Sequence, residues 1–462
     1  MPLIKSISGI RGTIGGKPGD NLTPVDIIQF TAAYAEWLKK QGAVNKVVIG
    51  RDGRISGPSV LSLVAETLLA CGIDVVNLGL STTPTVEIAV PHHEAGGGII
   101  VTASHNPAEW NALKLLNHKG EFINAAEGAD LLEIAATGQF NFAPVDKAGK
   151  MSYDETALRR HVDAILHHPL VDVSAITAAN FTIVIDAINS SGAIAVPALL
   201  SSLGVQQMHV INADITGNFA HNPEPLPEHL TSLREAVIKN KADVGIAVDP
   251  DVDRLCFVCE DGSLFGEEYT LVAVADYVLQ HRKGNTVSNM SSTRALRDVT
   301  IRHDGNYYAS AVGEVNVVNQ MKAQHAVIGG EGNGGIIIPE LHYGRDALIG
   351  IALFLSLLAK SNKTTAELRS TYPDYYMSKN KINLSEGMDV QKIFDSMKEK
   401  YSNQPMNMED GLKIEFERSW VHLRTSNTEP IIRIYSESET VEQADQLAHS
   451  IMQDIKDMAA SL

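Results

Sequence analysis

The chain has 462 residues, of which 44% are hydrophobic and 20% are charged, and its formal net charge is −17. This length is enough for three or four domains with a large buried core, and the composition is typical of a soluble globular protein. The acidic charge argues against nucleic acid or an anionic membrane as the main partner, so basic residues that bind an anionic ligand must gather locally.

The sequence predicts neither export nor membrane insertion. The longest apolar run, residues 347–359, is too short to span a bilayer and predicts a core helix. The first eleven residues lack the apolar region of a signal peptide. Cys256 and Cys259 form a C-x-x-C, but on a strand they point to opposite faces, so a structural zinc site is not expected. We therefore predict a reduced, cytoplasmic protein.

The hydrophobic pattern repeats three times along the chain as strand, helix, strand, helix, strand and loop, which indicates α/β units with largely parallel sheets. After about residue 370 the pattern changes to a small antiparallel α+β domain. We predict four domains, at residues 1–150, 151–258, 259–370 and 371–462. The expected strands of the three repeats lie at 46–50, 73–78, 98–102, 181–186, 207–211, 243–248, 286–290, 307–311 and 325–328, with helices between them at 59–71, 193–203 and 226–240.

Three carboxylates, Asp249, Asp251 and Asp253, directly follow the last strand of the second repeat. Open α/β sheets usually place their ligand on such loops. Carboxylates this close repel one another unless a hard divalent cation is bound by their oxygens, most simply Mg²⁺. An EF-hand loop also begins D-x-D-x-D, but Arg254 stands where that loop requires Gly. A solvated acidic turn is the other alternative, and the buried strands on both sides argue against it.

The last strands of the other two repeats also lead into unusual loops, Thr-Ala-Ser-His-Asn-Pro at 102–107 and Gly-Gly-Glu-Gly-Asn-Gly-Gly at 329–335. Three equivalent positions with three unusual loops predict one shared site, with each domain contributing a wall. Ser104 could carry a phosphoryl group, since covalent catalysis splits a hard transfer into two easier ones, or it could only cap the next turn. In the last domain, residues 424–430 offer an Arg fork for phosphate or form a plain turn.

These loops, together with Ser-Gly-Ile-Arg-Gly-Thr at residues 8–13, occur in an order and spacing that resemble the α-D-phosphohexomutase superfamily over the whole chain. The resemblance implies three mixed α/β domains and a small C-terminal domain around a central cleft. It implies transfer of a phosphate between C1 and C6 of a hexose through a phosphoserine enzyme. Mg²⁺ would be the cofactor, a hexose 1,6-bisphosphate the intermediate and activator, and a sugar phosphate the partner.

The resemblance also assigns roles to individual residues. The metal site would consist of the phosphoserine and the aspartate triplet: Ser104, Asp249, Asp251 and Asp253. The catalytic group would combine the phosphoserine with residues for proton transfer and charge stabilisation: Ser104, Arg11, His105, Lys114 and Arg254. The substrate group would bind sugar hydroxyls and the phosphate that does not react: Glu331, Asn333, Arg424, Ser426, Asn427 and Thr428.

Two loops depart from the patterns of the family. Pro250 and Val252 stand in the metal loop where many members carry Gly, but the aspartates are intact. The sugar loop reads Glu-Gly-Asn-Gly-Gly, whereas bacterial phosphoglucosamine mutases usually have Glu-Gln-Ser-Gly-His and many phosphomannomutases Glu-Met-Ser; similar Gly-Asn loops occur in archaeal-type members. We predict a phosphoglucosamine mutase first, with a phosphomannomutase or phosphoglucomutase as the alternative and a non-catalytic sugar-phosphate sensor as the alternative of another class.

Overall fold

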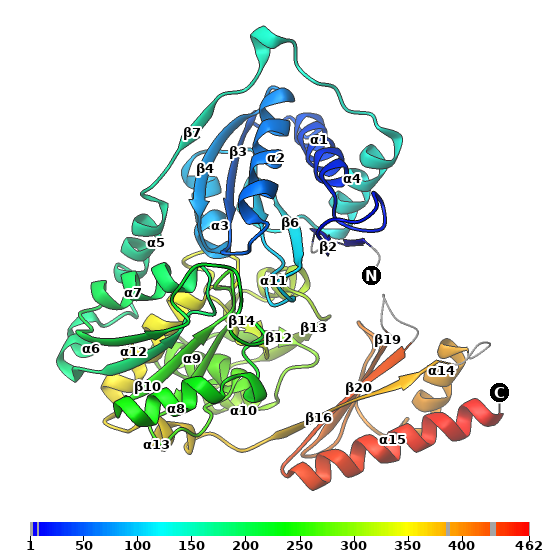
Figure 1. Cartoon of the computed structure of the whole chain (residues 1–462). Coiled ribbons are helices and arrows are strands. Elements are labelled where there is room, and N and C mark those ends of the chain that lie inside the picture. Colours follow the sequence, from blue (N-terminus) through cyan, green and yellow to red (C-terminus); the bar gives the residue numbers. More distant parts are fainter. Residues whose placement is uncertain (1–2, 7–8, 385–388, 426–430, 462) are drawn as a thin grey trace.

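The computed structural model describes residues 3–6, 9–384, 389–425 and 431–461, and it contains four sheets that follow one another along the chain (Figure 1). Figure 1 shows the unit of the first sheet, in blue, above the units of the second and third sheets, in green to yellow. The unit of the fourth sheet, in orange to red, lies to one side of them.

The first sheet carries helices on both faces because its central strands alternate their apolar side chains between the two faces. Val47 and Ile49 pack with α1, α2 and α4 on one face, whereas Val48 packs with α3 on the other. In sheet order the strands are β1 (Ile4–Ser6), β2 (Gly9–Thr13), β6 (Trp110–Leu116), β5 (Gly97–Val101), β3 (Lys46–Arg51), β4 (Asp74–Leu80) and β7 (Met151–Tyr153). The helices are α1 (Pro24–Lys40), α2 (Gly57–Ala70), α3 (Thr83–His92) and α4 (Ala125–Thr137), with a 3-10 turn η1 (Val145–Lys147).

The second and third sheets repeat the central four strands of the first. In each repeat the third strand lies parallel to the first, and a fourth strand returns antiparallel beside it: β5 with β6, β10 with β11 and β14 with β15. In sheet order the strands are β11 (Leu255–Cys259), β10 (Val244–Val248), β8 (Thr182–Asp186) and β9 (Gln207–Ile211), then β13 (Tyr307–Ser310), β12 (Asn285–Asn289), β14 (Ala326–Glu331) and β15 (Gly335–Ile337).

This topology confirms the three related α/β units, and it makes each of the three unusual loops the turn of a hairpin. The sheets are therefore mixed rather than parallel throughout, because each loop reverses the chain instead of leading to a helix. The strand β7, just after residue 150, pairs with β4 of the first sheet. The division of the chain at residues 150, 258 and 370 remains a prediction.

The units of the second and third sheets share one hydrophobic core, centred on α12 (Ala347–Ser361), which packs against α5, α6, α7 and α9. The expected core helix at 347–359 is thus confirmed, whereas the helix expected at 226–240 begins only at Thr231, because Pro227 opens a separate 3-10 turn, η2 (Pro227–His229). The remaining helices are α5 (Ala157–Leu166), α6 (Val173–Ala179), α7 (Gly192–Ser202), α8 (Thr231–Asn240), α9 (Glu267–His281), α10 (Ala295–Arg302), α11 (Glu314–Ala323) and α13 (Thr365–Arg369).

The fourth unit is an antiparallel sheet covered by two helices, as expected for the C-terminal α+β domain. It docks on the third unit: Ser291 contacts His422, and Glu437 accepts a hydrogen bond from the backbone N–H of Arg294. In sheet order its strands are β16 (Tyr376–Asn383), β20 (Ile431–Ser438), β19 (Trp420–Thr425), β18 (Leu412–Glu415) and β17 (Met406–Asn407), and its helices are α14 (Val390–Lys400) and α15 (Val441–Ser461).

Two smaller expectations can be compared with the structure. Among the described residues, no helix combines the length and apolarity that crossing a bilayer requires. Cys256 and Cys259 are buried and free, and no cysteine belongs to a cluster of metal-ligating side chains in the described part of the chain.

Candidate active site

The hairpin loops of the first two repeats meet directly. The hydroxyl of Ser104, on the loop between β5 and β6, donates a hydrogen bond of 2.7 Å to Asp249 Oδ2, on the loop between β10 and β11. The loop of the third repeat joins them through Arg345, which donates to Asp253 Oδ2 at 2.8 Å and to Glu331 Oε2 at 3.0 Å. The structure therefore brings the three loops together at one site.

The Ser104 loop is held in place by a network beneath it. The backbone N–H of Ser104, whose φ is +49°, donates to Thr102 Oγ1 at 2.9 Å, and the Thr102 hydroxyl donates to Asp52 at 2.7 Å. Arg54, which is completely buried, pairs with Asp52 and donates to four backbone carbonyls, those of Ser104, Asn106, Pro107 and Trp110. This network sets the position of the Ser104 side chain, and the burial of its members keeps it rigid.

The three aspartates form the acidic cluster that the sequence predicts. All three are buried, and one oxygen from each lies within 4.8 Å of the others. Asp251 Oδ1 and Asp253 Oδ1 have no hydrogen-bond partner among the described residues. Burial and the neighbouring aspartates raise the pKa of Asp249 well above its usual range. Buried and unpaired carboxylate oxygens are costly, so the donor set fits a hard divalent cation such as Mg²⁺.

The local conformation separates this loop from an EF-hand. Val252 adopts φ +62° within the turn, and the residues after Arg254 enter the buried strand β11 instead of a calcium-binding loop. Two flanking cations, Arg345 and Lys114, partly balance the charge of the triplet. Lys114 Nζ lies 2.7 Å from Asp251 Oδ2 and 3.1 Å from Asp253 Oδ2. Burial alone would lower the pKa of Lys114, but the two carboxylates outweigh it and raise the pKa. Lys114 is therefore a firmly protonated donor.

The other predicted catalytic residues surround Ser104. His105 Nδ1 lies 3.5 Å from Ser104 Oγ, and burial together with Arg254 lowers the pKa of His105 well below its usual value. A neutral imidazole near a hydroxyl is able to accept a proton. Arg254 donates to Glu224 Oε1 at 2.8 Å, and Arg11 donates to Asn106 Oδ1 at 3.2 Å. Both guanidinium groups thus lie close to the Ser104 loop.

A cavity of about 200 Å³ opens beside this centre, between the second, third and fourth units. Arg254 lines it and connects it to the Ser104 loop, although Ser104 itself is not part of its wall. The fourth unit contributes three cations, Arg424, Arg433 and Lys379, while Glu331, Asn333, Glu224, Glu267 and Glu268 come from the other units. Arg424 Nε pairs with Asp410 at 2.7 Å. The cavity thus has a cationic wall formed by the fourth unit, and residues of the 329–335 loop line it as well. The predicted site residues Ser426, Asn427 and Thr428 lie outside the described residues.

Two arginines that organise the site were not predicted from the sequence. Arg54 and its partner Asp52 directly follow the strand β3, at the same edge of the sheet as the other functional loops. Arg345 directly precedes the N-cap of α12, and besides Asp253 and Glu331 it binds Glu314 at 3.0 Å. The only signal in the sequence is a pair of opposite charges next to an apolar strand or helix. Pairs of this kind are also common on protein surfaces, so the signal is weak.

Comparison with known proteins agrees with this architecture along the whole chain. Four models of the phosphoglucomutase/phosphomannomutase family match in order: alpha/beta/alpha domain I at residues 3–142, domain II at 159–262, domain III at 266–375 and the C-terminal domain at 380–454. The chain belongs to this family, within the α-D-phosphohexomutase superfamily, and is a phosphohexomutase, an enzyme of the isomerase class.

Individual relatives are similar over nearly their full length. A phosphoglucomutase/phosphomannomutase of Thermococcus kodakarensis is 34% identical, covering 94% of this chain and 95% of the relative. A probable phosphoglucosamine mutase of Methanopyrus kandleri is 31% identical, with 95% of each chain covered. The crystal structure of a phosphoglucomutase/phosphomannomutase family protein from Burkholderia thailandensis superposes with a TM-score of 0.86 at 24% identity, covering 99% of this chain and 98% of that one.

Proposed function

We propose that this phosphohexomutase interconverts glucosamine 6-phosphate and glucosamine 1-phosphate. One observation carries the choice of sugar: Glu267 and Glu268, at the start of α9, line the cavity, and neither forms an ion pair within the described part of the chain. Glucosamine carries an ammonium group that glucose and mannose lack, and two neighbouring carboxyl groups without an ion pair of their own are suited to bind it.

The position of Glu268 supports this assignment. A Cβ atom at Gly332 would lie 2.0 Å from Glu268 Oε2, so the glycine of the sugar loop leaves the space that this carboxylate occupies. The same oxygen accepts a hydrogen bond of 2.9 Å from the backbone N–H of Thr293. Burial raises the pKa of Glu268 well above its usual range and raises that of Glu267. An ammonium group bound here would lower both pKa values and share its charge with both side chains.

Phosphoryl transfer would proceed at the Ser104 centre. The Ser104 oxygen carries the phosphoryl group, gives it to a sugar hydroxyl and later receives the other phosphate of the bisphosphate intermediate. Asp249, Asp251 and Asp253 would hold Mg²⁺, which when bound neutralises phosphate charge. Arg254 and Lys114 offer positive charge on either side of this centre. His105, neutral and near the hydroxyl, is the candidate proton acceptor.

The phosphate that does not react would bind at the cationic wall of the cavity. Arg424, Arg433 and Lys379 line this wall, and we assign Ser426, Asn427 and Thr428 to the same subsite from the sequence pattern alone. Glu331 and Asn333 line the cavity between the two phosphate sites and would bind the sugar hydroxyls. Glu331 has a fixed orientation, because Asn289 and Arg345 bind its two oxygens at 2.7 and 3.0 Å.

A substrate panel tests the choice of sugar. We expect the highest kcat/KM with glucosamine phosphate among glucosamine, N-acetylglucosamine, glucose and mannose phosphates. The Glu268→Gln variant should lose about 10- to 150-fold with glucosamine phosphate, the equivalent of one charge-assisted hydrogen bond of about 1.5–3 kcal/mol. Its kcat/KM with glucose phosphate should change little. A wild-type preference for glucose or mannose phosphate would instead assign the enzyme to the phosphoglucomutase or phosphomannomutase alternative.

The mechanism has a separate test in the intact mass of the purified protein. We expect a phosphoryl adduct after incubation with a hexose 1,6-bisphosphate, and its absence in the Ser104→Ala variant, which should also lose mutase activity. Full activity in that variant would refute the assignment of Ser104. Tight binding of sugar phosphates without any turnover by the wild type would instead support a sensor.

A further inference from the structure

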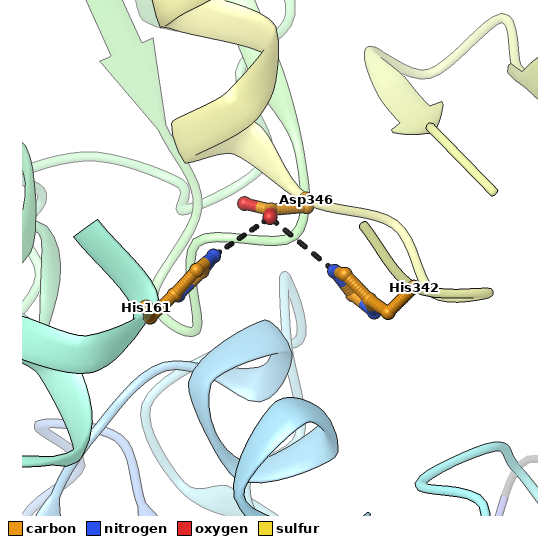
Figure 2. Close-up of side chains that lie close together, drawn as sticks. All are labelled: His161, His342 and Asp346. Carbon is orange, nitrogen blue, oxygen red and sulfur yellow. Dashed lines mark hydrogen bonds and ion pairs between the residues drawn. The ribbon is translucent and has the colours of Figure 1, made fainter. Parts of the chain in front are cut away.

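A second cluster of metal-ligating side chains lies away from the aspartate triplet, where three helices meet. His161 belongs to α5, whereas His342 and Asp346 belong to the loop that leads into α12, and α5 packs against both α3 and α12. Both imidazole rings point their Nε2 atoms at Asp346 Oδ2, at 2.8 Å for His161 and 3.3 Å for His342 (Figure 2). His161 and Asp346 are fully buried, while the His342 side chain is 12% exposed and leaves a path to solvent.

The second polar atom of His161 and that of Asp346 are fixed from outside the cluster. His161 Nδ1 lies 3.0 Å from Thr85 Oγ1 of α3. Asp346 Oδ1 accepts the backbone N–H groups of Leu348 and Ile349 and so caps α12, which leaves Oδ2 free to face the histidines. Such outer contacts orient the imidazole and carboxylate ligands of metal sites. Two of the three candidate ligand atoms, His161 Nε2 and Asp346 Oδ2, are therefore oriented in advance.

A buried carboxylate, Glu87, lies directly beside the cluster. Glu87 of α3 is 2% exposed, and neither of its oxygens has a hydrogen-bond partner among the described residues, although Oε2 lies 3.3 Å from His342 Nδ1. A Cβ atom at Gly344 would lie 1.9 Å from Glu87 Oε2, so only glycine lets the loop close over this carboxylate. The contact with the His342 imidazole offsets the cost of burying this carboxylate, and a metal ion that replaced a proton of His342 would supply positive charge at the same place.

We propose that His161 Nε2, His342 Nε2 and Asp346 Oδ2 form a binding site for a divalent transition-metal ion of the zinc type. Metal–ligand distances of about 2.0–2.1 Å in a tetrahedral site separate the ligand atoms by roughly 3.3 Å. The two nitrogen–oxygen separations of 2.8 and 3.3 Å, with all three atoms within 4.8 Å of one another, match this spacing after small side-chain movements. Two imidazoles favour zinc over Mg²⁺, which prefers oxygen ligands.

The charges agree with a divalent ion at this position. His342 faces a carboxylate on each side of its ring, with Nε2 3.3 Å from Asp346 Oδ2 and Nδ1 3.3 Å from Glu87 Oε2. A metal ion displaces the proton from Nε2, and the other ring proton, on Nδ1, then faces the Glu87 carboxylate. The two carboxylates would balance the charge of the ion. The fourth ligand would be a water molecule.

The site would be structural and would act on the active site through α3. Thr83, the first residue of α3, donates to Asp251 Oδ2 at 2.5 Å, so the helix that carries Thr85 and Glu87 also contacts the metal loop of the active centre. An ion bound by α5 and the start of α12, with α3 packed on both histidines, would fix the first unit against the other two. This would preserve the contact between Ser104 and Asp249 across the units.

The experiment measures metal binding directly and does not depend on the proposed sugar specificity. Chelator-treated full-length protein is titrated with Co²⁺ and Zn²⁺ in excess Mg²⁺, with bound metal measured by mass spectrometry and the Co²⁺ site by its visible absorption. We expect one equivalent of Zn²⁺, a tetrahedral Co²⁺ spectrum and a higher thermal midpoint with Zn²⁺. Asp251→Asn should retain all three responses, since Asp251 provides no ligand to the proposed zinc site.

Matched variants assign the site. His342→Gln and His161→Gln should each lose the spectrum and the Zn²⁺-dependent rise in thermal midpoint. The control is His93→Gln, because His93 pairs with Asp154 at 2.7 Å in a histidine–carboxylate contact outside the cluster. If folded wild-type protein binds no Zn²⁺ in excess Mg²⁺, or if His342→Gln binds it as tightly as the wild type, the proposal is wrong. The wild-type measurement decides even if a variant does not fold.

Discussion

Arg54 is the residue whose replacement should reveal most about how the Ser104 loop is positioned. Its guanidinium donates five hydrogen bonds, one to the Asp52 carboxylate and one each to the carbonyls of Ser104, Asn106, Pro107 and Trp110, at 2.5–3.1 Å. The Arg54→Lys variant keeps the charge and the pairing with Asp52. A lysine ammonium, however, has only three donors on a single atom.

The size of the effect follows from these contacts. With at most three of five acceptors satisfied, at least two buried acceptors lose their donor, at about 1–3 kcal/mol each, so we expect a loss of about 2–6 kcal/mol in unfolding free energy. The carbonyls released belong to the loop that carries Ser104. A displacement of about 1 Å of a reacting group reduces the rate by about 100-fold, and we expect kcat to fall by at least that factor.

Urea unfolding monitored by tryptophan fluorescence measures the stability, because Trp37 and Trp110 both lie in the first unit. The control is Arg51→Lys, in the same turn, since Arg51 donates one hydrogen bond, to the Asp52 carbonyl at 2.9 Å. The control should cost about 1 kcal/mol or less. An Arg54→Lys variant within about 0.5 kcal/mol of the wild type, with unchanged kcat, would refute this account of the loop.

Three further predictions concern the metal loop, the cationic wall and the pH dependence of stability. Asp251→Asn should lower kcat by about 100-fold or more, the equivalent of about 3 kcal/mol for a broken buried charge pair, while calorimetry shows sugar-phosphate affinity within a few-fold of the wild type. Arg424→Ala should lower kcat/KM by about 10- to 150-fold. The control is Arg418→Ala, which breaks an ion pair with Glu439 in the same unit and should leave kcat/KM unchanged. If the two variants have equal kcat/KM, Arg424 does not belong to the site. Burial lowers the pKa of His422 to about 4, so as the pH falls the unfolded chain binds a proton at this residue before the folded chain does. The free energy of unfolding should therefore fall by about 3 kcal/mol between about pH 6.5 and pH 4. Unfolding measured across this pH range should lack that component in the His422→Gln variant.

Hydrophobic periodicity was enough to predict the α/β units because it reflects burial directly. The alternation around Val47 and Val48 places neighbouring side chains on opposite faces of one sheet, each covered by its own helices. The apolar run of α12 likewise predicts a buried helix. The same pattern did not predict β6, whose residues from Trp110 to Leu116 are all buried and show no alternation. Nor did the pattern predict that the chain reverses at the three loops, because a hairpin turn and a connection to a helix use similar residues.

By itself, the sequence determined the order of the repeats, the positions of the special loops and the chemical character of each loop, because these depend on residues adjacent in the chain. Only the tertiary structure decided which groups meet. The bonds from Ser104 to Asp249, from Arg345 to Asp253 and from His161 to Asp346 join residues that are distant along the chain. Local propensity carries no information about contacts between residues so far apart in the chain. These contacts form when the packing of α12 and α3 brings the units together.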